Sequence, residues 1–155
     1  PAATREPLQF GAEIYGHAGL EADLEAVELA QACLHAAGLR DLQLDLADVR
    51  VIDAVLDPLR LPAAQVARLH AALTAKDAAE LRTLSRDLPE STRADLARLP
   101  TLYGGRGVLA EARRALTPSP LLHTALDALQ WLADHVQGMQ LSFDLSDLRG
   151  YAYYS

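Results

Sequence analysis

The sequence of 155 residues contains a single cysteine, Cys33, and no apolar run of about 18 residues. One cysteine rules out a disulfide within the chain, as is common in the reducing cytosol. The missing apolar run rules out a membrane-spanning helix, and no segment reads as a signal peptide. Because Cys33 stands in an apolar helical stretch, we expect a small core residue there rather than a nucleophile. The chain is therefore expected to be a cytoplasmic protein.

Basic residues are also scarce. The chain has 14 Lys and Arg against 21 Asp and Glu, a formal net charge of −7 and a pI near 5.1. Such a balance repels phosphate backbones, so no nucleic-acid partner is expected. Half of the residues are apolar and 23% are charged, which is ordinary for one globular domain with its own core.

The common catalytic signatures are missing: HExxH, GxSxG, a Walker loop and paired CxxC. The five histidines do not fall at metal-ligand spacing. The glycine-rich residues 104–107 follow no predicted strand and lack the Lys-Ser/Thr of a phosphate loop, so we predict a flexible connection. Asp45, Asp48 and Asp53 are interpreted as capping and solvent-facing groups. We therefore predict no catalytic residue, metal or cofactor.

Strand and helix patterns alternate through the first third of the chain. Apolar residues at every second position predict a strand over residues 8–15. Apolar residues on one face predict a helix over residues 20–37, which Gly38 ends. A second alternating segment predicts a strand over residues 42–47, followed by a short helix over residues 50–56.

The rest of the chain begins with a helical block. Residues 62–117 carry short helical patterns separated by Pro and Gly, with no strand pattern. Ser119 and Pro120 then begin a long helix that runs to Val136. Residues 141–145 and 151–154 alternate as two further strands, whose short connection favours antiparallel pairing. Strands on both sides of a helical block predict an α+β fold.

Two segments could carry a binding site. Gln9 and Glu13 point to the same face of their predicted strand with a glycine between them, an arrangement that can receive an ammonium group. Arg149, followed by a glycine and by aromatics that include Tyr153 and Tyr154, can clamp a carboxylate and a flat ring. The alternative is that Gln9 and Glu13 face solvent and the tyrosines pack at a sheet edge.

The same two segments resemble the histidyl-tRNA synthetase family. Residues 9–16, QFGAEIYG, are similar to the end of that family's second class motif, where a Gln and a Glu contact histidine. Residues 148–155, LRGYAYYS, are similar to its histidine-specific segment, but Ala152 stands where the synthetases have an aspartate. Residues 15–25, 99–109 and 143–151 are most similar to the family's regulatory paralogues, which serve ATP phosphoribosyltransferase.

This resemblance implies a fold and a pocket. Residues 1–155 would be a fragment of a class II aminoacyl-tRNA synthetase-like core, an antiparallel sheet with a helical insertion over residues 62–117. Residues carried over from the family motifs would line a histidine-like pocket: Gln9, Glu13, Arg149, Tyr153 and Tyr154. Since the strand-like run near Tyr154 meets the end of the sequence and no Met stands at position 1, we expect a piece of a longer polypeptide.

The function that the resemblance implies is regulatory. The protein would be a non-catalytic subunit that supports the short catalytic chain of ATP phosphoribosyltransferase and relays feedback inhibition by L-histidine in the first step of histidine biosynthesis. It would form a homodimer within a hetero-oligomer. Two alternatives stay open: a fragment of a true histidyl-tRNA synthetase, and an α+β module that has lost its ligand. In each case we expect unpaired strand edges that favour association.

Overall fold

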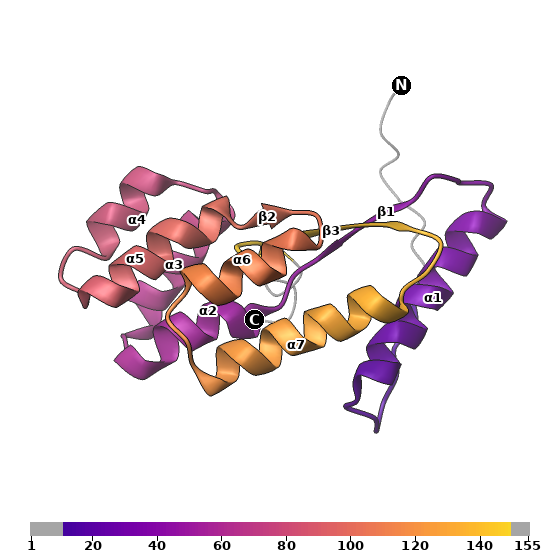
Figure 1. Cartoon of the computed structure of the whole chain (residues 1–155), viewed down its shortest axis with the longest axis horizontal. Helices are drawn as coiled ribbons and strands as arrows, with labels where there is room; N and C mark the ends of the chain where they lie inside the picture. Colours follow the sequence, from indigo (N-terminus) through magenta and orange to yellow (C-terminus); the bar gives the residue numbers. More distant parts are fainter. Residues whose placement is uncertain (1–10, 150–155) are drawn as a thin grey trace. The chain divides into compact units, whose positions relative to one another are not determined.

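The computed structural model describes residues 11–149, which belong to two compact units, Pro1–Arg40 and Asp41–Ser155. The first, the N-terminal unit, contains helix α1, Leu20–Ala36 (Figure 1). Gly38 adopts a φ of +87° and donates to the His35 carbonyl, while Leu39 donates to the Leu34 carbonyl. These two bonds form a Schellman motif, which confirms the predicted helix and its glycine stop.

Two expectations for the N-terminal unit were wrong. Residues 11–15, the described part of the predicted strand over residues 8–15, form no strand. A strand needs a neighbour for its backbone hydrogen bonds, and no described strand pairs with this segment. Cys33 is half-buried, in a helix without a buried residue, so it is not a core residue.

The second unit, called the main unit, contains a three-stranded sheet with the order β1-β3-β2. Strand β1 is Gln43–Leu46, β2 is Tyr103–Gly104 and β3 is Gln140–Asp144. Strands β1 and β3 pair in parallel, and β2 and β3 pair antiparallel. The connection from β1 to β3 contains several helices, which is the long crossover that parallel pairing requires. Antiparallel pairing among the described strands is thus limited to β2 and β3.

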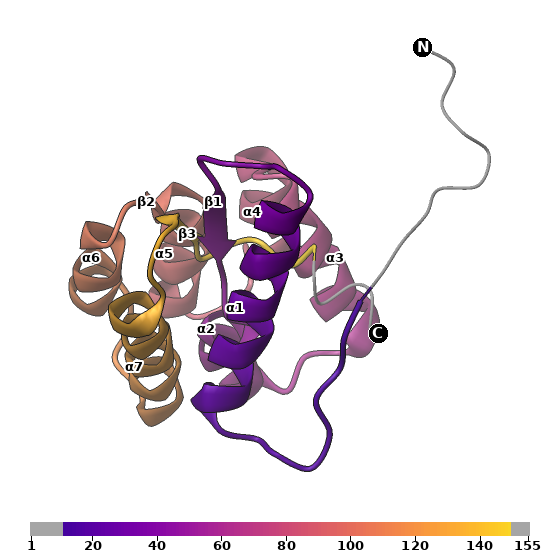
Figure 2. The same ribbon diagram turned by 90° about the vertical axis from the view of Figure 1, so that its right-hand side faces the viewer.

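Six α-helices and two short 3₁₀ turns complete the described part of the main unit (Figure 2). Side chains of Asp48, Asp77 and Ser119 accept hydrogen bonds from the first turns of α2, α4 and α7, which confirms the capping roles predicted for Asp48 and Ser119. The elements are α2 Val49–Leu56, η1 Asp57–Leu59, α3 Ala63–Thr74, α4 Ala78–Leu84, α5 Glu90–Arg98, η2 Leu99–Thr101, α6 Gly107–Ala115 and α7 Pro120–His135.

One hydrophobic core joins the helical block to the sheet. Leu69 of α3, Leu96 of α5, Leu126 of α7 and Phe143 of β3 are all buried in it, and α2 packs along α7 (Figure 1). The α+β fold is confirmed. The helical block contains strand β2, contrary to the expectation that it has no strand, because a strand of two residues is too short to show alternation.

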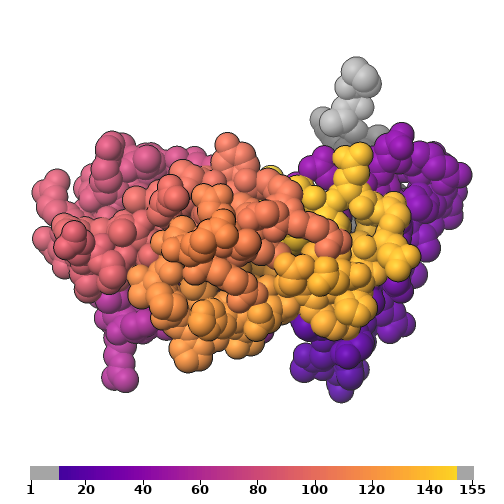
Figure 3. Space-filling view, in the orientation of Figure 1, coloured from indigo at the N-terminus to yellow at the C-terminus, as the bar shows by residue number. Residues whose placement is uncertain are grey.

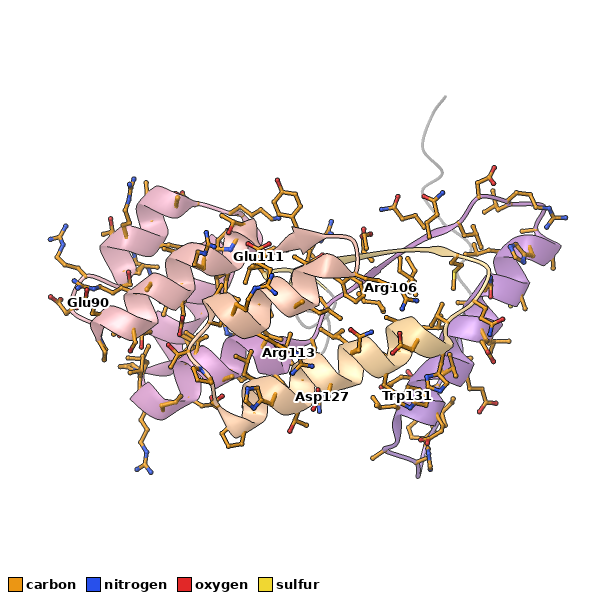
Figure 4. All side chains as sticks on the ribbon, in the orientation of Figure 1. Glu90, Arg106, Glu111, Arg113, Asp127 and Trp131 are labelled. Carbon is orange, nitrogen blue, oxygen red and sulfur yellow. The ribbon has the colours of Figure 1, made fainter. Side chains whose placement is uncertain are left out.

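The outer faces of α6 and α7 are joined by ion pairs. These two helices, in orange, form much of the surface shown in Figure 3. Arg113 of α6 lies 2.6 Å from Asp127 of α7, and Arg106 lies 2.7 Å from Asp134 (Figure 4). Both pairs are largely exposed, so each contributes at most about 1 kcal/mol. They are interpreted as structural pairs that align the two helices.

Candidate functional site

The structure describes only part of the predicted histidine-like pocket. Gln9, Tyr153 and Tyr154 lie outside the described residues. Glu13 belongs to the N-terminal unit, where it is exposed and accepts a hydrogen bond from the Tyr15 hydroxyl. Arg149 belongs to the main unit. The pocket therefore stays a prediction, and its environment can be described only around Arg149.

Two aspartates shape the segment that carries Arg149. At the end of strand β3, the side chain of Asp144 accepts from the backbone N–H of Ser146 at 3.1 Å and from its hydroxyl at 2.8 Å. The side chain of Asp147 accepts from the backbone N–H of Arg149 at 2.9 Å. These are two successive Asx turns. Because Leu145 and Leu148 between them are buried, the segment is anchored to the core.

The Arg149 side chain is held by the same aspartate. Its Nε donates to both carboxylate oxygens of Asp147, at 3.0 and 2.9 Å. Hydrogen bonds from Arg149 lower the pKa of Asp147 below its ordinary value, and the same bonds raise the pKa of Arg149. The guanidinium is nevertheless largely exposed. A ligand carboxylate would have to share Arg149 with Asp147 or displace it.

Lys76 is a member of this cluster that sequence reasoning missed. It follows helix α3 with a φ of +52° and occupies the position where helices usually place glycine. Its backbone N–H donates to the Leu73 carbonyl, and the next N–H donates to the Ala72 carbonyl. The Lys76 ammonium lies 2.8 Å from Asp144 and 4.1 Å above the centre of the Tyr103 ring. No sequence signal near Lys76 indicates either contact, since both partners are distant along the chain.

Together these side chains line a hollow of about 220 Å³, whose wall comprises Thr74, Lys76, Asp144, Ser146, Asp147 and Arg149. The wall contains two cations and two carboxylates, and the Ser146 hydroxyl donates to Asp144. Each carboxylate of the hollow is thus paired with a cation, Asp144 with Lys76 and Asp147 with Arg149. Among residues 11–149, no group of three or more His, Cys, Asp or Glu side chains is placed to hold a metal ion.

The α+β architecture is shared with synthetase-like proteins. A crystal structure of an ATP phosphoribosyltransferase regulatory subunit/histidyl-tRNA synthetase from Bacillus halodurans superposes with a TM-score of 0.67. The two chains are 25% identical, and the match covers 84% of this chain and 36% of the other. The family model for histidyl-tRNA synthetase matches residues 1–155. The chain belongs to the histidyl-tRNA synthetase family.

Relatives at higher identity are regulatory subunits by name. The ATP phosphoribosyltransferase regulatory subunits of Verminephrobacter eiseniae and Paracidovorax citrulli are 54% and 53% identical over 155 residues. That of Variovorax paradoxus is 55% identical over 159 aligned residues. The matches cover all of this chain but 40–41% of each relative. The resemblance found at residues 9–16 and 148–155 is thereby confirmed for the whole chain. No helix within residues 11–149 is long and apolar enough to cross a membrane.

Proposed function

We propose that this chain is part of a regulatory subunit of ATP phosphoribosyltransferase. The identity of 50–55% over nearly the whole chain to proteins of that name carries the proposal. The subunit would assemble with the short catalytic chain, support its activity and relay feedback inhibition by L-histidine. It would do so in the cytoplasm, as a homodimer within a hetero-oligomer.

The subunit itself would be non-catalytic. Ala152 stands where the synthetases of this family carry an acid. The loss of this acid supports binding without chemistry.

L-Histidine is the proposed effector, bound by Gln9, Glu13, Arg149, Tyr153 and Tyr154. The Glu13 carboxylate would bind the ammonium group of the amino acid, and the Arg149 guanidinium would bind its carboxylate. The partner and the effector are tested in one experiment. The whole gene product that contains this chain is mixed with the short catalytic chain, and size-exclusion chromatography and transferase activity are measured with and without histidine.

We expect a complex with raised activity that histidine inhibits. Glu13→Ala should weaken the inhibition and leave the complex intact. Glu28→Ala is the matched control, because Glu28 is an exposed carboxylate of the same unit. It should change neither the inhibition by histidine nor the formation of the complex. Failure to form a complex would refute the regulatory role, whereas inhibition that survives Glu13→Ala would refute only the pocket.

A second candidate is a histidyl-tRNA synthetase. The name of the matching family and the double name of the Bacillus halodurans protein favour it. Histidine-dependent exchange of pyrophosphate into ATP by the whole gene product separates the two. Exchange would establish the synthetase, and its absence together with complex formation would support the regulatory subunit.

A further inference from the structure

A second hollow in the main unit lies beside helices α4 and α5 and strand β2. It measures about 740 Å³, within the range of small-molecule sites. The residues that line it are Lys76, Ala78, Leu81, Arg82, Ser85, Arg86, Arg93, Ala97, Pro100, Thr101 and Tyr103. We refer to this hollow as the α4–α5 groove.

Its rim carries positive charge in a chain of net charge −7. Arg82 lies on α4 and Arg86 lies in the turn just after that helix, and both line the groove. Arg93 of α5 donates to the Arg86 carbonyl at 3.4 Å, which brings its guanidinium to the same end of the groove. Within the described part of the chain, none of these three arginines forms an ion pair with an acid. Lys76 differs, because Asp144 partly neutralises it.

Apart from these charged side chains and Tyr103, the lining is mostly apolar, with Ser85 and Thr101 as its polar members. Ala78, Leu81, Ala97 and Pro100 provide apolar lining. Ser85 also lines the groove and is only 4% exposed, so its hydroxyl is available to a group bound in the groove.

An aromatic ring stands beside the groove. Tyr103 is 61% exposed, so part of its ring is accessible to a ligand. The Lys76 ammonium covers one face of this ring and thereby orients it. A flat ligand ring can contact the rest of the tyrosine by offset stacking.

We propose that the α4–α5 groove binds a ring-bearing organic phosphate of the nucleoside monophosphate class. The combined positive charge of three arginines without acidic partners is more than one carboxylate would balance. A phosphate, which carries a charge of about −1.5 to −2 at neutral pH, suits it better. Guanidinium forks bind phosphate oxygens in pairs. The apolar lining and Tyr103 would receive the ring, and the Ser85 hydroxyl would bond to a polar atom of the ligand. The groove residues alone carry this proposal, and it does not depend on the regulatory role.

Isothermal titration calorimetry of the whole gene product tests it, with AMP as the probe and adenosine and inorganic phosphate as separate ligands. AMP should bind saturably with a Kd below about 1 mM and more tightly than either part alone. Affinity should fall as salt rises, because the charges are exposed. Absence of saturable AMP binding would overturn the proposal. If inorganic phosphate bound as tightly as AMP, the proposed contact between a ligand ring and the apolar lining with Tyr103 would be overturned.

Variants locate the site. Arg86→Ala removes one phosphate ligand and should weaken AMP binding by about tenfold. Ser85→Ala should weaken it by a smaller factor while circular dichroism shows an intact fold. Arg114→Ala is the matched control, since Arg114 is an exposed arginine on α6, outside the groove, and should leave the Kd unchanged. Equal losses for Arg86→Ala and Arg114→Ala would overturn the placement. Loss of catalytic-subunit binding in Arg86→Ala without any AMP binding would instead identify a protein-docking surface and overturn the proposal.

Discussion

Lys76 and Arg60 offer a matched test of the contacts around the candidate site. Both are non-glycine residues with left-handed backbones, at φ of +52° and +47°. This conformation costs an L-residue about 1 kcal/mol, which glycine avoids. Lys76 lies 2.8 Å from Asp144 and 4.1 Å above the Tyr103 ring. Arg60 is exposed and forms no ion pair with another described residue. The same substitution should therefore have different effects at the two positions.

The magnitudes follow from these contacts. Arg60→Gly relieves the strain and should stabilise the main unit by about 1 kcal/mol. Lys76→Gly relieves the same strain but loses a half-exposed ion pair and a cation–π contact, each about 0.5–1 kcal/mol. Its net effect should be near zero. Lys76→Ala loses both contacts and keeps the strain, so it should destabilise by about 1–2 kcal/mol.

Urea unfolding measures these differences. Trp131, the single tryptophan, lies on α7 of the main unit, so its fluorescence reports the unfolding of the unit that contains both sites. The gap between Arg60→Gly and Lys76→Gly should shrink from about 0.1 M to about 1 M salt, as the ion pair is screened. If Lys76→Gly stabilises the protein as much as Arg60→Gly does, the Lys76 contacts contribute nothing and the reasoning is refuted.

Three further predictions concern the core and two titrating groups. Leu126→Ala, at a fully buried position, should lower the free energy of unfolding by about 3–5 kcal/mol. Leu29→Ala, at a position 44% exposed, should change it by less than about 0.5 kcal/mol. Equal losses in the two variants would contradict the assignment of Leu126 to the core. Hydrogen bonds from Arg149 lower the pKa of Asp147, so the stability they contribute is present above the ordinary pKa and is lost as pH falls through the lowered one. Carboxyl NMR titration should show this lowered pKa and its return toward the ordinary value in Arg149→Ala; an unchanged pKa would argue against the pair. Burial lowers the pKa of His70 below 6.5, so the unfolded state binds more protons and stability should fall as pH drops from about 7 to about 5.5. His70→Gln should reduce that loss, and a variant with the same pH dependence would disprove the assignment.

Local signals predicted most of the described helices correctly. Gly38, Asp77 and Ser119 mark helix ends because each satisfies backbone groups of its own helix, so the information lies within a few residues. The predicted strand over residues 8–15 failed in its described part for the opposite reason. Alternation gives a segment one apolar face, but only a neighbouring strand completes its hydrogen bonds.

The candidate site was predictable only in part. Arg149 was singled out from its sequence context, but its pairing with Asp147 was not foreseen. Lys76 was missed because glycine, rather than lysine, is the ordinary residue after a helix. The spacing of Arg82 and Arg86 does not predict the α4–α5 groove, because Arg86 lies beyond the end of α4 and Arg93 comes from another helix.

By itself, the sequence determined the α+β class, the helix caps and, through residues 9–16 and 148–155, membership of the histidyl-tRNA synthetase family. Only the tertiary structure decided that β1 pairs in parallel with β3, that Lys76 reaches both Asp144 and Tyr103, and that three arginines gather at one groove. The reason is the distance along the chain over which each kind of signal acts. Periodicity and capping act within a few residues, whereas these contacts join segments that only the folded core brings together.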